Sequence, residues 1–229
     1  MKNTIILLLS VISLSARATI FIVAYDPLTG AMGQAVSSSG PAYVGTSRFQ
    51  VREHGIGIVG GGGQGLCGSA NARNLLQAHF SADEIAQRIK LRCDRRKPYY
   101  RLAVVTANGD IALHLGPDGC NSHNVNCGKV EGQTVGVIGG GLKAGVLNGT
   151  FEHFNSLDPA ISLECRLLST LRKTYELGGE FKNFIVANIV VSHPSRSREN
   201  VWQAKGQESG LLSKLSHDMN QSGANCTGI

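Results

Sequence analysis

The sequence has few of the features that are typical of membrane proteins or of nucleic-acid-binding proteins. After residue 18, no stretch is long and apolar enough to cross a bilayer, which takes about 20 residues. Aromatic residues make up only 6% of the sequence, and charged residues 17%. The one basic cluster, KLRCDRRK at 90–97, has few aromatic neighbours, so we interpret it as the solvated end of a helix. We therefore expect no nucleic acid among the partners.

The first eighteen residues have the pattern of an export signal. Lys2 supplies a positive charge, residues 5–14 form an apolar stretch, and small residues end the segment in A-R-A. A buried first strand or a membrane anchor is the alternative, but Arg17 fits poorly at the end of a buried strand. We predict a signal peptide at 1–18, a mature chain that begins at Thr19, and a secreted or periplasmic protein with no membrane contact after the signal is removed.

Six cysteines follow this segment. An even number in an oxidising compartment favours disulfides, although sequence does not determine the pairing. The pairs that close short loops are Cys67 with Cys93 and Cys120 with Cys127. A metal site at Cys120, His123 and Cys127 is the alternative, and it lacks a fourth ligand at a recognisable spacing. We therefore expect disulfides and no metal.

The remaining residues, roughly 210 of them, are enough for one domain. The predicted strands cover 19–25, 31–39, 55–59, 101–106, 110–115, 133–141 and 181–192, and the predicted helices begin near Ser69, at Ser81, at 142 and at 159. Strands that come in adjacent pairs, with pairs of helices between them, favour two mainly antiparallel sheets with helices outside. The predicted class is α+β, with a domain at 19–202 and a polar, flexible tail at 203–229.

Thr19 is a candidate nucleophile if cleavage makes it the N-terminus. A threonine hydroxyl reacts poorly unless a base lies beside it. A free N-terminal threonine carries that base itself, because the α-amino group has an unperturbed pKa of about 7.7–8.0. The alternative is that Thr19 merely begins a strand.

A glycine-rich turn at 60–63 follows one of the predicted strands. The backbone N–H groups of Gly60 and Gly61 could stabilise a developing oxyanion, since the turn leads into a helix. A dinucleotide-binding G-x-G-x-x-G pattern can also be drawn through Gly60, Gly62 and Gly65. The surrounding elements form no βαβ unit, no acidic residue ends a second strand, and there is no Walker lysine. We therefore expect no nucleotide and no other cofactor.

Several segments, in their order, resemble the DUF1028 family of the N-terminal-nucleophile (Ntn) hydrolase superfamily. TIFIVAYDPLTGAMGQAVSSS is similar to the opening of that family, and further similar segments are VGTSRF, YYRLAVVTANGDIALHLGPDGC, GGGLKAGVLNGTFEHF and LECRLLSTLRKTYELGGEFK. The resemblance covers about residues 19–191. It implies a four-layer αββα sandwich of two mainly antiparallel sheets, a fold that the order of elements also favours.

The resemblance also implies a catalytic site. Its residues would be Thr19, Gly60, Gly61, Ser37, Ser39, Arg48 and Arg52. Thr19 would act as nucleophile and base, and the two glycines would donate to the oxyanion. The serines at the end of the second strand would lie beside Thr19 and tune its amine. One of the two arginines would supply the positive charge that such sites place near the nucleophile.

Two functions remain open. The first is a secreted Ntn-type amidohydrolase that cleaves the C–N bond of a small amide or peptide-like substrate. The second is a catalytically silent exported binding protein on the same fold, and departures from the family pattern motivate it. Relatives often carry a basic residue where Ser39 stands and a V-Q-G-N-like segment where this chain has VIGGG, and Glu180 and Lys182 match the family only approximately. Either protein could form a homo-oligomer.

Overall fold

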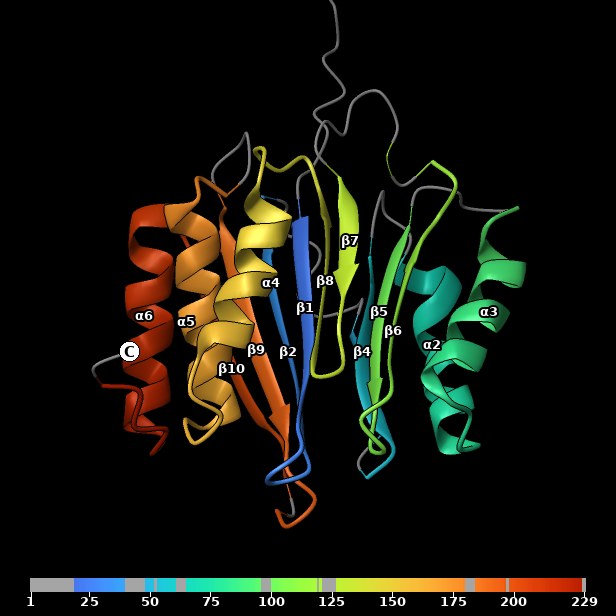
Figure 1. The fold of residues 1–229 in the computed structure, drawn as a ribbon, viewed down its shortest axis with the longest axis horizontal. Helices are drawn as coiled ribbons and strands as arrows, with labels where there is room; N and C mark the ends of the chain where they lie inside the picture. The colour runs from blue at the N-terminus through green and yellow to red at the C-terminus, as the bar shows by residue number, and fades with distance from the viewer. Residues whose placement is uncertain are drawn as a thin grey trace, which may run out of the picture.

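The computed structural model describes residues 19–39, 48–51, 53–60, 65–95, 100–118, 120, 127–179, 184–196 and 198–227, without the side chains of 65–67 and 208–209. Within these residues, ten strands form two antiparallel sheets, and five helices pack on them. Figure 1 shows the sheets face to face, with helices on the outer side of each. The α+β class with two antiparallel sheets is therefore confirmed.

The six-stranded sheet has the order β10-β9-β2-β1-β8-β7, and every neighbouring pair is antiparallel. Its strands are β1 (Thr19–Asp26), β2 (Ala31–Ser38), β7 (Gly128–Glu131), β8 (Val135–Gly140), β9 (Val186–Ser192) and β10 (Asn200–Lys205). β1 forms where TIFIVAY is rich in β-branched and aromatic residues. The Asp26 carboxylate closes the turn into β2, accepting from the Leu28 N–H at 3.1 Å and the Thr29 hydroxyl at 2.7 Å.

The four-stranded sheet has the order β3-β4-β5-β6. Its strands are β3 (Arg48–Val51), β4 (Gly55–Gly60), β5 (Arg101–Thr106) and β6 (Ile111–Leu115). The hairpin that Asn108 and Gly109 predict is confirmed by the pairing of β5 with β6. Gly109 has a φ of +86° and donates its N–H to the Thr106 carbonyl at 2.9 Å, a conformation that glycine adopts without strain.

Helices cover the outer face of each sheet. α2 (Gly65–Gln77) and α3 (Ala82–Cys93) pack on the four-stranded sheet, and α4 (Val146–Ser156), α5 (Leu163–Glu176) and α6 (Glu208–Gln221) pack on the six-stranded sheet (Figure 1). The predicted capping box of α3 is present, since the Ser81 hydroxyl accepts from the Glu84 N–H and the Glu84 carboxylate accepts from the Ser81 N–H. α4 starts later than predicted because Gly145 before it has a φ of +80°, which is not helical. No helix in the described part of the chain has the length and apolar character to span a bilayer.

Apolar side chains fill three layers, one between the two sheets and one between each sheet and its helices. Side chains along β1 alternate, so Phe21 and Val23 lie between the sheets, whereas Ile20 and Ile22 face the helices of the six-stranded sheet. Residues of both sheets pack in the central layer, which holds them face to face. The direction of any side chain on β1 or its neighbours can therefore be assigned from its position along the strand.

The C-terminal part differs from the flexible tail predicted at 203–229. Residues 208–221 form α6, and its Leu211, Leu215 and Met219 are buried against the six-stranded sheet. The prediction was wrong because it relied on the polar composition of the segment. Apolar residues recur in it with a four-residue spacing and form a stripe along one side of the helix. Such a stripe is enough to bury one face of a helix.

Disulfides form in agreement with the expectation of paired cysteines. The bonds between described side chains are Cys120–Cys127 and Cys165–Cys226. The first confirms a predicted pair. The second joins α5 to the C-terminus and was not predicted. Cys93 is also disulfide-bonded, and its predicted partner Cys67 has its side chain outside the described residues.

A buried polar cluster lies at the end of the six-stranded sheet opposite the start of β1. Arg166 of α5 lies 3.3 Å from the Asp26 carboxylate, and both side chains are 5% exposed or less. His193, after β9, lies 3.8 Å from Glu164 of α5. Burial lowers the pKa of His193, and Arg196 lowers it further, although Glu164 and Asp26 act in the opposite direction. Folding therefore favours the neutral form of this histidine.

We expect the free energy of unfolding to fall as the pH is lowered from about 7 to about 5. The pKa values of both His193 and His153 are lowered below 6.5 in the folded protein, chiefly by burial. The unfolded chain therefore binds more protons just below pH 6.5, so stability that is present above this pH is lost as the pH falls. Urea unfolding at a series of pH values measures the effect. The double variant His153→Gln, His193→Gln should show a shallower dependence, and an unchanged slope would contradict the assignment.

Candidate active site

Thr19 begins β1, a strand that lies inside the six-stranded sheet. It is paired with Ser38 of β2 on one side and with Gly140 of β8 on the other, and it is 4% exposed. Because Phe21 and Val23 lie between the sheets, the alternation along β1 directs the Thr19 hydroxyl into the same space. Its Oγ1 atom lies 2.9 Å from the Ser38 hydroxyl oxygen, and either group can donate.

Ser38 is the serine that contacts the candidate nucleophile, whereas Ser37 and Ser39 were predicted. The Ser37 hydroxyl lies on the other face of β2, 2.6 Å from the Tyr175 hydroxyl of α5. Successive side chains of a strand point to opposite faces, so Ser37 faces the helices when Ser38 faces Thr19. Ser39 follows the end of β2. The predicted segment, Ser37 to Ser39, does lie at Thr19, but its middle residue Ser38 makes the contact and was not named among the site residues.

Arg101 was missed by the sequence analysis. It is the first residue of β5 and is 4% exposed. Its guanidinium lies against Gly140, because a Cβ atom added to Gly140 would overlap the guanidinium and also meet Cβ of Cys127 at 2.9 Å. Gly140 is the pairing partner of Thr19, so the guanidinium is close to the candidate nucleophile. A signal was present in the sequence, since an arginine opens the otherwise apolar strand RLAVVT.

The glycine predicted to donate to an oxyanion is at the same end of the sheets. Gly60 ends β4 and pairs with Arg101. A Cβ atom added to Gly60 would collide with the ring of Phe21, so this glycine lies in the layer between the sheets. Gly61, the second predicted donor, is outside the described residues.

Of the two arginines that the sequence analysis named as site residues, only Arg48 is among the described residues. Arg48 begins the edge strand β3 and is half-buried. It pairs with Ile58, whose side chain lies between the sheets, so Arg48 projects toward that layer from the edge. Arg52 lies outside the described residues. Arg101, rather than either of these, packs against the pairing partner of Thr19.

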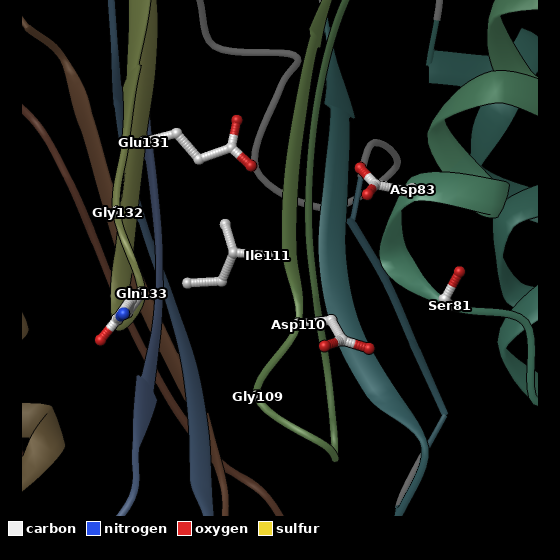
Figure 2. Close-up of a pocket in the computed structure, with 8 residues that line it drawn as sticks. All are labelled: Ser81, Asp83, Gly109, Asp110, Ile111, Glu131, Gly132 and Gln133. Carbon is white, nitrogen blue, oxygen red and sulfur yellow. The ribbon is translucent and has the colours of Figure 1, made fainter.

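A pocket of about 560 Å³ lies at the opposite end of the sheets (Figure 2). It is lined by Ser81, Asp83, Gly109, Asp110, Ile111, Glu131, Gly132 and Gln133. Glu131 comes from the side of the six-stranded sheet, Asp110 from the turn between β5 and β6, and Asp83 from α3. In the described part of the chain, no group of three or more His, Cys, Asp or Glu side chains could hold a metal ion. None of the predicted site residues lines this pocket.

Comparisons with known proteins bear on the family. The model of DUF1028, described as a family of unknown function, matches residues 19–216. A crystal structure of protein SPO2555 from Silicibacter pomeroyi, titled with the same family model, superposes with a TM-score of 0.76 at 20% identity, over 90% of this chain and 89% of that chain. At this identity the likeness shows a shared fold alone. A search of curated proteins finds no match. Because the family model covers most of the chain, this protein belongs to the DUF1028 family.

Proposed function

We propose that the protein is an exported Ntn-type amidohydrolase whose mature chain begins at Thr19. The observation that carries the proposal is the position of Thr19 at the start of a strand inside a sheet, with its hydroxyl between the two sheets and beside Ser38. The match to the family begins at the same residue. Under this proposal, the two sheets and their outer helices are the four-layer αββα sandwich of Ntn hydrolases.

The proposed reaction needs only groups of the chain and water. The free α-amine of Thr19 accepts the proton of its own hydroxyl as Oγ1 attacks the amide carbonyl. The tetrahedral intermediate collapses to an ester on Oγ1, and the leaving amine takes the proton. Water then attacks the ester, with the α-amine again as base, which releases the acid. Ser38 orients the hydroxyl, and the N–H groups at Gly60 and Gly61 are the candidate oxyanion donors.

Arg101 supports this chemistry electrostatically. The free amine must be uncharged to accept a proton, and a nearby cation disfavours its charged form. The guanidinium packs against Gly140, next to Thr19, from the opposite sheet. The family resemblance implies a positive charge near the nucleophile, from Arg48 or Arg52. Under this proposal, Arg101 supplies that charge instead.

Export is supported by the disulfides. Cys120–Cys127 and Cys165–Cys226 are both formed in the described chain. Disulfides form and persist in oxidising compartments, such as the periplasm and the extracellular space. The mature protein that we propose is therefore secreted or periplasmic. We also propose that its substrate is a small amide or peptide-like molecule.

The N-terminus of the exported protein tests the proposal. We expect intact mass and N-terminal sequencing, on protein collected after export from its own host, to give a free Thr19. A recombinant chain that begins at Thr19 should then form an acyl-enzyme with members of an amide panel, seen as a mass increase. The matched control carries one additional alanine before Thr19 and should form none. A native terminus at another residue, or a blocked amine, would overturn the proposal.

A further inference from the structure

We propose that two adjoining pockets, at the end of the sheets opposite Thr19, bind a small organic cation that carries at least two amino groups. One is the pocket of about 560 Å³ described above, and the other has a volume of about 210 Å³. Ser81 lines both pockets, so they meet at this residue. The site is separate from Thr19, and the inference does not depend on the proposed function.

The smaller pocket contains a buried hydroxyl group without a partner. Thr106 is 5% exposed, and its Oγ1 atom has no hydrogen-bond partner among the described residues. Leu102 and Val104, on the same face of β5, pack against α2 and α3, so the Thr106 side chain points to that side of the sheet, where it lines the pocket. A buried hydroxyl group without a partner is costly, and a ligand that donates a hydrogen bond would satisfy it.

Two histidines on the wall of the smaller pocket add acceptors. The rings of His54 and His79 have centroids 4.3 Å apart and an interplanar angle of 85°. A neutral imidazole has one acceptor nitrogen besides its N–H group. Within the described chain, the residues other than glycine with a positive φ are His79, at +59°, and Glu53, at +67°, and both line this pocket. Such a conformation is uncommon for residues with a side chain and recurs at ligand-binding sites.

The walls of both pockets are rich in carboxylates. These belong to Asp83, Asp110 and Glu131 in the larger pocket (Figure 2) and to Glu53 and Glu84 in the smaller one. In the described part of the chain, no Lys or Arg lines either pocket. The whole chain has a formal charge of +6, so its overall field does not attract cations. The pockets are therefore a local exception that favours a positively charged ligand.

Two cations near the pockets leave other carboxylates unpaired. Lys129 lies 3.5 Å from Glu131, and the guanidinium of Arg88 lies over the Phe80 ring, 4.2 Å from its centre. Asp83 and Asp110 form no ion pair with any described residue.

The carboxylates also lie apart from one another. They come from α3, from the turn between β5 and β6, and from β7, and no three of them could hold a metal ion in the described part of the chain. Separated carboxylates suit separate ammonium groups of one molecule, each of which offers three N–H donors and no acceptor. One amino group of the ligand would then donate to Thr106 and the histidines, and another would lie between Asp83 and Asp110.

Binding of spermidine, a triamine, tests this inference on the purified protein. Titration calorimetry at low salt would compare spermidine with triacetylspermidine, whose three nitrogens are uncharged amides. We expect spermidine to bind at least about 10-fold more tightly. The double variant Asp83→Asn, Asp110→Asn should bind spermidine at least about 10-fold more weakly than the parent. Glu176→Gln, Asp218→Asn is the matched control, because it removes two carboxylates from α5 and α6 and should change the affinity by less than about twofold.

The variant Thr106→Val separates binding from folding. It removes a buried hydroxyl that has no partner and keeps the shape of the side chain, so thermal stability should stay the same or rise. The affinity for spermidine should nevertheless fall at least about threefold, because the ligand loses one acceptor. An affinity that is unchanged in this variant would overturn the inference.

Three other results would also contradict the proposed site. They are no binding of spermidine, equal affinity for spermidine and triacetylspermidine, and equal losses of affinity in the two double variants. If the variant Asp83→Asn, Asp110→Asn does not fold, Asp110→Asn alone replaces it, since this residue is exposed in a turn. The single variant should then lower the affinity at least about threefold, and an unchanged affinity would count against the site.

Discussion

Replacement of Thr19 by alanine, in a chain that begins at this residue, is expected to lower the rate of amide hydrolysis by about 10³- to 10⁶-fold. The change removes the hydroxyl that attacks the carbonyl and leaves the α-amine in place. Stability should change by about 1 kcal/mol, because the hydrogen bond of the Thr19 side chain with Ser38 joins two neutral groups. Initial rates with the best substrate of the amide panel measure the loss, and thermal unfolding measures the stability.

Three further variants separate the hydroxyl from the amine. Thr19→Ser keeps both groups and should retain activity. An alanine inserted before Thr19 keeps the hydroxyl but moves the amine, so it should be as inactive as Thr19→Ala. Ser38→Ala removes the neighbour of the hydroxyl and should have an intermediate rate. If Thr19→Ala hydrolyses amides at the rate of the parent, the hydroxyl is not the nucleophile, and the exported binding protein becomes the better hypothesis.

The elements with strong local signals could be predicted from the sequence. β1 is a run of β-branched and aromatic residues, Asn108 and Gly109 mark a hairpin, and Ser81 and Glu84 form a capping box. Each depends on contacts among residues close in the chain. β3, β7 and β10 were missed because they are short edge strands with polar positions. α6 was missed because most of its residues are polar, and the few apolar residues that stabilise it do so by packing on the sheet.

The candidate site also has features that could be predicted from the sequence and features that could not. The segment Ser37 to Ser39 was correctly expected near Thr19, because a hairpin pairs the start of β1 with the end of β2. Which serine faces Thr19 depends on the strand register, and a shift of one residue reverses every side chain. Arg101 reaches the site only because the two sheets stack. The order of elements favours two stacked sheets but does not show which side chains meet between them, and Arg48 and Arg52 were chosen instead.

Replacement of Arg166 by leucine is expected to lower the free energy of unfolding by about 3–5 kcal/mol. Arg166 and Asp26 are 3.3 Å apart, and their side chains are only 5% and 4% exposed. The variant leaves the Asp26 carboxylate buried without its cation, although two hydrogen bonds from the adjacent turn remain. The change also removes the contact of the guanidinium with the Phe154 ring, at 5.3 Å from its centre. Urea unfolding at neutral pH measures the loss.

Two further variants test whether the buried, unpaired Asp26 carboxylate causes the loss of stability. One breaks a surface ion pair, and the other is a double variant. Lys173→Ala breaks the partly exposed pair with Glu176 on the same helix and should cost less than about 0.5 kcal/mol. Adding Asp26→Asn to Arg166→Leu removes the uncompensated charge and should recover part of the lost stability. If Arg166→Leu alone costs under about 1 kcal/mol, then the bonds from Leu28 and Thr29 are enough to hold the carboxylate, and the arginine serves mainly to pack against Phe154.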